Sequence, residues 1–328
     1  MYPININRIS QLMAKEFPEQ MYLVDRLVPD AGFTIFSGAP RSYKTFALLH
    51  LAQSVASGEP FLNQFPTQQT GVLLIDEENG ERLLQQRMRL MGISEDLPIF
   101  YTPSMGFVLS DENIEATIQK CIENNIGLVI IDSLIRVHSA EENSAKEMAA
   151  VSRQLRKFTE NGIALIVTQH NRKQGAFNTG AGNEMRGSSE ILAAADGHIG
   201  MSRKDKSYIR FDQTKQRYAV ELEPFEVKVN ASDQEFAFEF IGYLKPQADK
   251  DEILKKAVVQ LLVENVQLKQ KEILDKLTEL GIRTNEHKIR SLLSRWEAEG
   301  LIQPPLVGAG NTKLYSLKEQ INENSENE

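Results

Sequence analysis

Between residues 33 and 240, short apolar runs alternate with longer amphipathic stretches. Four of the runs are apolar along nearly their whole length: Phe33 to Phe36, Val72 to Ile75, Leu128 to Ile131 and Ala164 to Val167. Strands covered by helices on both faces have this composition, so the pattern predicts an α/β fold with a mostly parallel sheet. After His198 the strand-like segments are closely spaced, which predicts an antiparallel extension at one end of the sheet. These segments are Tyr208 to Phe211, Phe225 to Val229 and Glu235 to Ile241.

From residue 251 onward, apolar residues recur at helical spacing and predict three helices. Gly281 ends the second helix, Thr284 can cap the start of the third, and Gly300 ends it. The third helix is expected to bury Ile289, Leu292, Leu293 and Trp296. A hairpin follows around the turn-rich GAGN, and three helices before a β-wing is the order of a winged helix-turn-helix domain.

These changes of pattern predict the domain organisation. Residues 1–32 form an N-terminal segment that packs on the core, and residues 33–245 form the α/β domain. Residues 246–250 are a linker, residues 251–318 form the winged helix-turn-helix domain, and the polar residues 319–328 form a disordered tail.

Composition narrows the classes of protein that fit this chain. Hydrophobic residues make up 41% and charged residues 25% of the 328 residues, as is typical of globular proteins. Acidic residues (45) outnumber basic ones (37), so contact with nucleic acid requires a local basic patch. The single cysteine, Cys121, excludes an intramolecular disulfide and a multi-cysteine zinc site. No apolar run approaches the ~18 residues of a membrane span, so we expect a cytoplasmic protein without membrane contact.

A phosphate-binding loop is predicted between the first strand and the helix that follows it. The string GAPRSYKT lies between FTIFS and FALLHLAQSVAS, which is the strand, loop, helix context of a P-loop. Lys44 would reach the β- and γ-phosphates of ATP, and the Thr45 hydroxyl would bind Mg²⁺. The predicted nucleotide-binding residues are Gly38, Ala39, Pro40, Arg41, Ser42, Tyr43, Lys44 and Thr45. The alternative is a buried turn without a ligand.

Tyr43 departs from the usual loop pattern, which has glycine immediately before the lysine. If the backbone has a positive φ angle there, a bulky residue costs about 1 kcal/mol or more. The effect of this residue on nucleotide affinity is left open by the sequence.

Two acidic strand ends supply candidates for hydrolysis and for metal binding. GVLLIDEEN ends in three carboxylates, and we assign Glu78 as the general base that activates water. GLVIIDSL places Asp132 at the carboxyl end of a buried strand, where it can hold magnesium through water. Each acidic end alone is also compatible with a solvated turn.

A third strand, IALIVT, ends in the polar string QHNRK. Gln169 or His170 could hydrogen-bond the γ-phosphate and respond to its loss, although either could equally be a strand cap. His170 has no companion cluster of histidines or cysteines, so we do not expect it to bind a metal.

With these four strings in place, residues from about 20 to 245 resemble the RecA-fold P-loop ATPases of the plasmid RepA and DnaB replicative-helicase type. The resemblance implies that Lys44 and Glu78 are catalytic, that Asp132 coordinates magnesium, and that Gln169, or else His170, is the sensor. QTKQRY resembles the basic tip that reaches into a neighbouring subunit. Lys215 and Arg217 are therefore implied as fingers acting within a ring, expected to be hexameric, although both could be solvated strand residues.

The resemblance also implies contacts with DNA. RGSSEILAAAD, from Arg186 onward, resembles a segment common in this family, and the Gly-rich stretch before it would be a mobile DNA-binding loop. The predicted nucleic-acid contacts in this region are Arg172, Lys173 and Arg186.

The third C-terminal helix, residues 284 to 299, is expected to expose Lys288, Arg290 and Arg295 to nucleic acid. The helix also carries three glutamates, so docking to another protein is the competing interpretation.

Three functions are compatible with these motifs. The first is an oligomeric, ATP-hydrolysing nucleic-acid motor, such as a DNA helicase that replicates a plasmid, phage or mobile element. The second is an ATP-switched DNA-binding regulator or loader of replication or partition, which does not unwind DNA. The third is a binding protein without enzymatic activity, in which Tyr43 prevents the P-loop from binding nucleotide.

Overall fold

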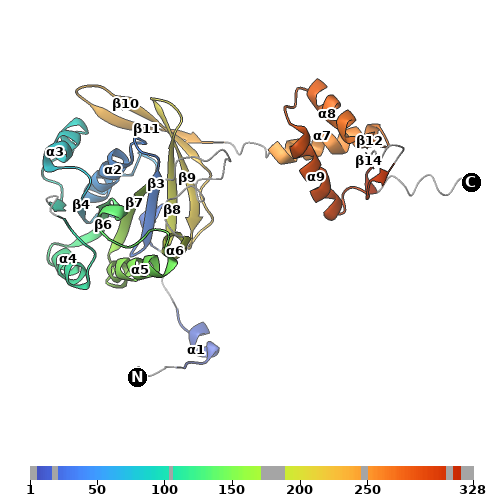
Figure 1. The fold of residues 1–328 in the computed structure, drawn as a ribbon. Coiled ribbons are helices and arrows are strands. Elements are labelled where there is room, and N and C mark those ends of the chain that lie inside the picture. The colour runs from blue at the N-terminus through green and yellow to red at the C-terminus, as the bar shows by residue number, and fades with distance from the viewer. Residues whose placement is uncertain are drawn as a thin grey trace, which may run out of the picture. The chain divides into compact units, whose positions relative to one another are not determined.

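The computed structural model describes residues 6–16, 21–102, 106–170, 189–244, 250–307 and 313–318. The chain divides into two compact units, residues 1–245 and residues 246–328 (Figure 1). Four sequence predictions fall outside the described residues. They are the nucleic-acid contacts Arg172, Lys173 and Arg186, the Gly-rich stretch, the tail, and the linker apart from Lys250, where a helix begins.

Nine strands from the described part of unit 1 form one sheet. In spatial order they are β11 (Phe236–Tyr243), β10 (Phe225–Ala231), β9 (Tyr208–Gln216), β8 (Gly197–Arg203), β3 (Phe33–Gly38), β7 (Ala164–His170), β6 (Ile126–Asp132), β4 (Gly71–Asp76) and β5 (Ile99–Thr102). The strands from β8 to β5 run parallel to one another, and β9, β10 and β11 pair antiparallel beyond β8. The predicted mostly parallel sheet is confirmed. The apolar pattern did not reveal β5 and β8, which are short or interrupted by glycine and polar residues.

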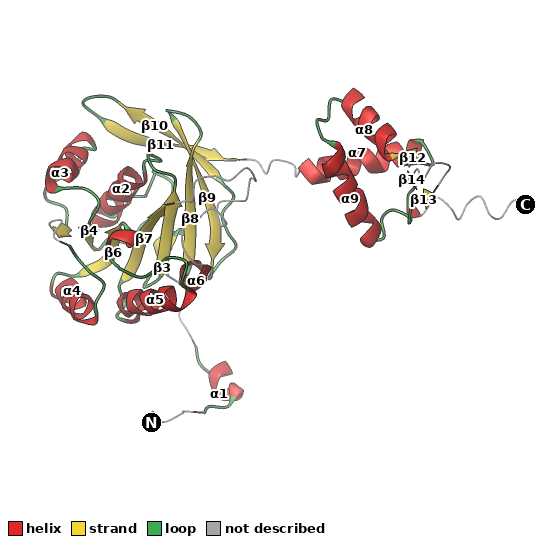
Figure 2. Ribbon diagram, viewed as in Figure 1, coloured by secondary structure: helices red, strands yellow, loops and turns green. Residues whose placement is uncertain are grey.

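Helices cover both faces of this sheet (Figure 2). On one face lie α2 (Lys44–Ser57) and α3 (Glu81–Leu90); on the other lie α4 (Asp111–Glu123), α5 (Ala145–Glu160) and α6 (Ser189–Ala194). Successive side chains of a strand point to opposite faces. Leu128 and Ile130 of β6 therefore pack in the core on the α2 side, and Val129 and Ile131 pack in the core on the α5 side. A short 3₁₀ helix, Leu134–Arg136, follows β6.

The two described stretches of the N-terminal segment differ in packing. Residues 21–32 contain a small antiparallel pair, β1 (Tyr22–Val24) and β2 (Val28–Pro29), and contribute Leu23 and Leu27 to the core beside α2. All residues from 6 to 16 are exposed, including the short helix α1 (Ile9–Met13). Residues 21–32 thus pack on the core, and the packing predicted for residues 1–32 as a whole stays a prediction.

The antiparallel extension places aromatic side chains over the start of α2. The Phe236 ring of β11 stacks on Phe46 with ring centroids 3.9 Å apart and lies 5.5 Å from the Tyr43 ring. Phe225 of β10 stacks on Phe211 of β9 at 5.0 Å. These contacts connect the edge of the sheet to the helix that follows β3.

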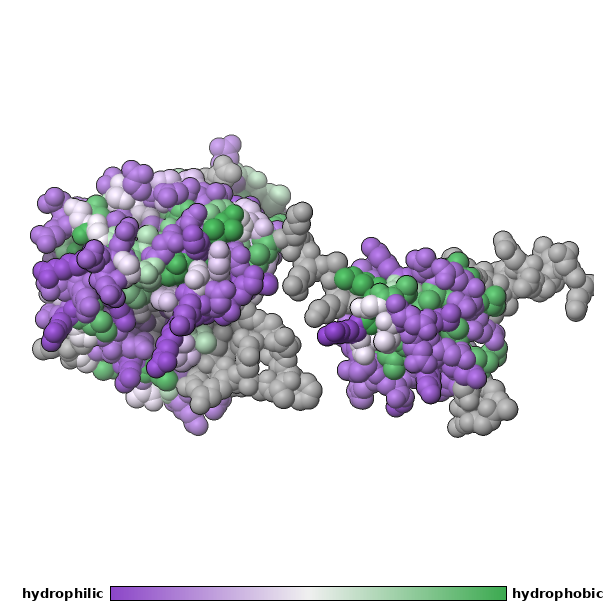
Figure 3. Space-filling model, turned by 90° about the horizontal axis from the view of Figure 1, so that it is seen from above, coloured by the Kyte–Doolittle hydropathy of each residue, from purple (hydrophilic) through white to green (hydrophobic). Residues whose placement is uncertain are grey.

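Unit 2 has three helices, α7 (Lys250–Glu264), α8 (Gln270–Glu279) and α9 (Glu286–Ala298). A three-stranded antiparallel sheet has the order β12 (Leu268–Lys269), β14 (Lys313–Tyr315), β13 (Leu306–Val307). Its core contains the predicted set Ile289, Leu292, Leu293 and Trp296. Figure 3 shows the visible face of this unit as mainly hydrophilic. The winged helix-turn-helix assignment stays a prediction.

One detail of the third helix was wrong. Asn285, not Thr284, is the N-cap, because the Asn285 side chain accepts a hydrogen bond from the Lys288 backbone N–H at 2.8 Å. An N-cap residue must accept from the second or third N–H of the helix, and Thr284 lies one position too early.

Trp296 is the only tryptophan in the chain, so its fluorescence reports on unit 2 alone. We predict that Leu293→Ala, which opens a cavity beside the fully buried Trp296, lowers the free energy of unfolding of unit 2 by about 2–5 kcal/mol. The measurement is denaturant unfolding followed by tryptophan emission. Ser294→Ala, an exposed neighbour on the same helix, is the control. Equal midpoints for the two variants would contradict the packing described.

Candidate nucleotide site

The loop between β3 and α2 is held in place by small residues and by a buried histidine. A Cβ atom on Gly38 would lie 2.6 Å from the Met201 carbonyl oxygen, so only glycine fits there. Just before it, the Ser37 hydroxyl lies 2.8 Å from Nε2 of His198 on β8, and Thr214 contacts the other ring nitrogen. Burial, and secondarily Lys215, lowers the pKa of His198 to about 4. The ring is therefore neutral at pH 7, and it joins the loop to β8 and β9.

Lys44 begins α2 and is 7% exposed. Its Nζ donates hydrogen bonds to the carbonyl oxygens of Gly38 (2.9 Å) and Ala39 (3.0 Å) and lies 3.4 Å from Nδ1 of His170. Burial lowers the pKa of Lys44, while the charges of Asp132 and Glu78 act in the opposite direction. A buried ammonium group that is held mainly by carbonyl oxygens of its own loop is suited to exchange them for a phosphate.

Thr45 and Asp132 are in direct contact. The Thr45 hydroxyl donates to Oδ2 of Asp132 at 2.7 Å, and the Thr168 hydroxyl of β7 donates to Oδ1 at 2.6 Å. The first turn of α2, β6 and β7 therefore meet at one carboxylate.

The three carboxylates after β4 have different surroundings. Asp76 accepts hydrogen bonds from the backbone N–H groups of Glu78 and Asn79, which turns the chain at the strand end. Glu77 accepts from the N–H groups of Gly106 and Phe107. Glu78 is left facing His170, with 3.5 Å between its Oε1 and Nε2 of the ring. Of the three, Glu78 lines the cavity in front of the loop, as the sequence predicted for the general base.

Gln169 and His170 are adjacent on β7 and point to opposite faces of the sheet. His170 lines the cavity beside Lys44 and Glu78, whereas Gln169 is buried and does not line it. The geometry thus favours His170 over Gln169 as the residue that senses the γ-phosphate. The resemblance had placed Gln169 first.

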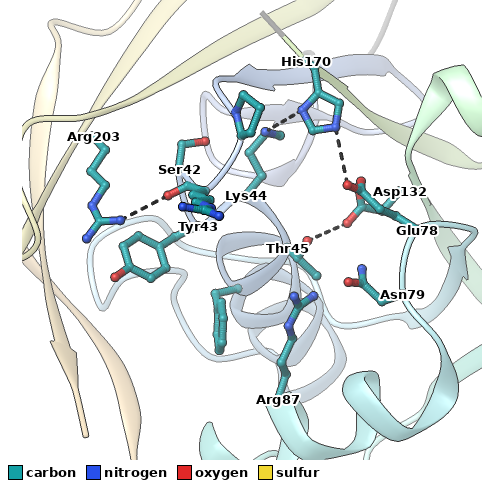
Figure 4. Close-up of a pocket in the computed structure, with 13 residues that line it drawn as sticks. Ser42, Tyr43, Lys44, Thr45, Glu78, Asn79, Arg87, Asp132, His170 and Arg203 are labelled. Carbon is teal, nitrogen blue, oxygen red and sulfur yellow. Dashed lines mark hydrogen bonds and ion pairs between the residues drawn. The ribbon is translucent and has the colours of Figure 1, made fainter.

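These side chains border a cavity of about 380 Å³ (Figure 4). The sequence-predicted lining comprises Pro40, Arg41, Ser42, Tyr43, Lys44, Thr45, Glu78, Asp132 and His170. Sequence reasoning missed Phe46, Asn79, Arg87 and Arg203. Phe46 and Asn79 directly follow recognised motifs, but Arg87 and Arg203 are brought in by α3 and β8, and nothing in their local sequence marks them.

Comparison with known proteins shows the family of this chain and its fold. The sequence model of the AAA_25 family, described as an AAA domain, matches residues 5–176, more than half of the chain. The chain belongs to the AAA_25 family. The solved structure titled "ATPase Domain of G40P" is similar in fold, with a TM-score of 0.52 and 16% sequence identity over 63% of this chain and 85% of that one. Among curated proteins, none matches. The predicted resemblance to RecA-fold ATPases of the replicative-helicase type is confirmed.

Magnesium, which such ATPases use, fits the residues of this AAA_25 member. Thr45 and Asp132 offer a hydroxyl and a carboxylate oxygen 2.7 Å apart beside the loop, and hard oxygen donors of this kind suit Mg²⁺ that keeps several waters. Across the described ranges there is no group of three or more His, Cys, Asp or Glu side chains placed to hold a metal ion. Nor does any described helix have the length and apolarity to cross a bilayer.

Tyr43 of this AAA_25 member has φ 64° and ψ 22°, the left-handed conformation in which glycine is usual. The ring is held by Phe236 and Phe46, and the Arg203 guanidinium lies 4.8 Å from its centroid. Tyr43 therefore has the left-handed backbone conformation usual for glycine, and its ring makes contacts that glycine lacks.

The predicted fingers make contacts within their own chain. Lys215 Nζ donates to the carbonyl oxygens of Leu192 and Ala193 at the end of α6. Arg217 is 40% exposed and pairs with Asp196 at 2.6 Å. Their role in a neighbouring subunit stays a prediction.

The predicted nucleic-acid residues of α9 do not share one environment. Lys288 pairs with Asp251 of α7 at 2.9 Å, and Arg295 pairs with Glu299 at 3.2 Å and lies 3.9 Å from Asp251. Among the described residues, Arg290 forms an ion pair only with exposed Glu286 of its own helix. Lys288 and Arg295 thus join α9 to its surroundings, and Arg290 is the most accessible of the three cations.

We predict that Tyr43→Gly lowers stability although it restores the usual loop residue. Glycine relieves about 1 kcal/mol of backbone strain, but the variant loses two ring contacts and one cation–π contact worth about 0.5–1.5 kcal/mol each. The melting temperature, measured by circular dichroism, shows whether lost ring contacts outweigh relieved strain. The Tyr43→Phe variant should have the melting temperature of the wild type. A higher melting temperature for Tyr43→Gly would show that strain outweighs packing.

Proposed function

We propose that this protein is an oligomeric ATP hydrolase that moves along DNA, with DNA unwinding as its activity. One observation carries the proposal: Lys44, Thr45, Glu78, Asp132 and His170, from four separate elements, converge on one cavity. This set supplies a phosphate cradle, two oxygen ligands for magnesium and a general base.

The chemistry follows from the positions of these groups. The loop N–H groups, the amino end of α2 and Lys44 would bind the phosphates of ATP, and Thr45 and Asp132 would hold Mg²⁺, which neutralises charge on the transferring phosphoryl group. Glu78 would orient a water molecule and accept its proton. His170 lies between Glu78 and Lys44, at 3.5 Å and 3.4 Å, so loss of the γ-phosphate would alter the contacts of a residue that directly precedes the predicted DNA-binding segment.

Assembly into a ring, which we propose to be hexameric, would bring Lys215 and Arg217 to the nucleotide of a neighbouring subunit. The partial exposure of Arg217 supports this, since its guanidinium is accessible while paired with Asp196. Such a residue must leave its internal partner to act in another subunit, so hydrolysis would depend on assembly.

The first test measures ATP hydrolysis with Mg²⁺, with and without single-stranded DNA. We expect the DNA to raise the rate, Lys44→Ala to abolish nucleotide binding, and Glu78→Gln to lower the rate by about 10²-fold or more while ATP still binds. Glu77→Gln is the matched control, because its carboxylate contacts backbone N–H groups away from the cavity. Hydrolysis that ignores every nucleic acid, or that survives Glu78→Gln, would refute the motor.

An ATP-switched DNA-binding regulator is the second candidate, favoured by the separate core of unit 2. Residues 250–318 contain 12 basic and 9 acidic residues, in a chain whose net charge is −8. Residues 250–318 are therefore locally basic, although all of unit 2 carries 12 basic and 14 acidic residues. This basic segment is a reasonable site for binding duplex DNA through the Arg290 face of α9.

For unit 2 we expect removal of residues 246–328 to abolish duplex binding and to leave ATP hydrolysis within about twofold. Arg290→Ala should weaken duplex binding and reduce its salt dependence, whereas Lys288→Ala should mainly destabilise the unit. Fluorescence anisotropy with labelled duplex measures both effects. Duplex binding that is sequence-selective and needs ATP, without stimulated hydrolysis, would favour the regulator. Unchanged binding after the deletion would exclude unit 2 as the DNA-binding part.

A further inference from the structure

Arg87 of α3 is an additional cation at the nucleotide cavity. Its guanidinium lies over the Phe46 ring, 5.4 Å from the centroid, and it lines the cavity with Thr45 and Asn79. Its Nη1 atom is buried, and no atom of the described residues accepts a hydrogen bond from it. Figure 4 shows the side chain rising from α3 with its guanidinium directed toward Thr45.

The two carboxylates that border the cavity already have neighbours. Asp132 accepts hydrogen bonds from Thr45 and Thr168, and Oε1 of Glu78 lies 3.5 Å from Nε2 of His170. A buried donor left without a partner destabilises the folded protein, and more so when the group is charged. Arg87 lines the cavity with a buried N–H group that lacks an acceptor among the described residues, and it is therefore suited to donate a hydrogen bond to a bound ligand.

The position of Arg87 indicates which part of the nucleotide it would contact. Phe46 follows Thr45 in the first turn of α2, and in Figure 4 Arg87 lies on the opposite side of Thr45 from His170. Hydrolysis is proposed at the His170 and Glu78 end. Arg87 therefore faces the portion of the nucleotide that is retained after the γ-phosphate leaves. A planar guanidinium fork matches phosphate oxygens, and the ring beneath it holds the fork in orientation.

We propose that Arg87 binds, from within the same chain, a phosphate common to ATP and ADP, next to the nucleoside. This rests on the proposed nucleotide site. Arg87 would bind the nucleotide both before and after hydrolysis and so retain ADP. Glu78 and His170 would act at the γ-phosphate.

The test compares the affinities of Mg-ADP and of a non-hydrolysable ATP analogue by calorimetry, using the full chain. We expect Arg87→Met, which keeps an unbranched side chain but removes the guanidinium, to weaken both ligands by a similar factor of about 10 to 100. Arg87→Lys should weaken both by a smaller, equal factor, because a point charge replaces the fork. Arg89→Met, an exposed arginine on the same helix, should bind both as the wild type does.

Each other outcome has a definite meaning. Loss of the ATP analogue alone would overturn the assignment, since Arg87 would then contact the γ-phosphate. Unchanged affinities in both Arg87 variants would overturn it as well. If Arg87→Met does not fold, as judged by circular dichroism, Arg87→Lys carries the test alone. Failure of the wild type to bind either nucleotide would refute the proposed function and not this residue's role in particular.

Discussion

The hydrogen bonds from Thr45 and Thr168 to the two oxygens of Asp132 are the contacts on which the site depends. They join the first turn of α2 to the ends of β6 and β7, three elements that are distant in the sequence. A parallel sheet makes this meeting possible, because the carboxyl ends of its strands lie along one edge and the loops that follow them are neighbours. Lys44, Glu78 and His170 occupy the same edge, so their spacing follows from the register of the strands.

The antiparallel extension stabilises the unusual phosphate loop. Tyr43 has the left-handed conformation that favours glycine, and its ring is held by Phe236 of the extension, Phe46 of α2 and Arg203 of β8. The same aromatic group positions Phe46 beneath Arg87. A residue that looks like a defect in the motif is thus one member of a packed cluster, and the cluster connects the edge of the sheet with the nucleotide cavity.

Unit 2 has a hydrophobic core of its own. Its helices bury their apolar residues around Trp296. Two of the three cations proposed on α9 serve mainly to join that helix to its surroundings, which limits the surface available for DNA to the side that carries Arg290. The basic excess is confined to residues 250–318, and the salt dependence of any duplex binding would report how many phosphates these cations contact.

The sequence by itself determined the α/β class, most of the strands and the residues of the loop and acidic strand ends, since these depend on local apolar runs and on residue types at short spacing. It could not decide whether Gln169 or His170 faces the nucleotide cavity. The two side chains point to opposite faces of β7, and only the folded sheet shows which face borders the cavity. The sequence also did not reveal Arg87 and Arg203, which reach the cavity only because α3 and β8 lie beside α2 and β3 in the folded chain. The conformation of Tyr43 was likewise decided by packing, since the rings that hold it come from distant parts of the sequence. Local chemistry can be read from neighbouring residues, whereas convergence of distant side chains exists only after the layers have assembled.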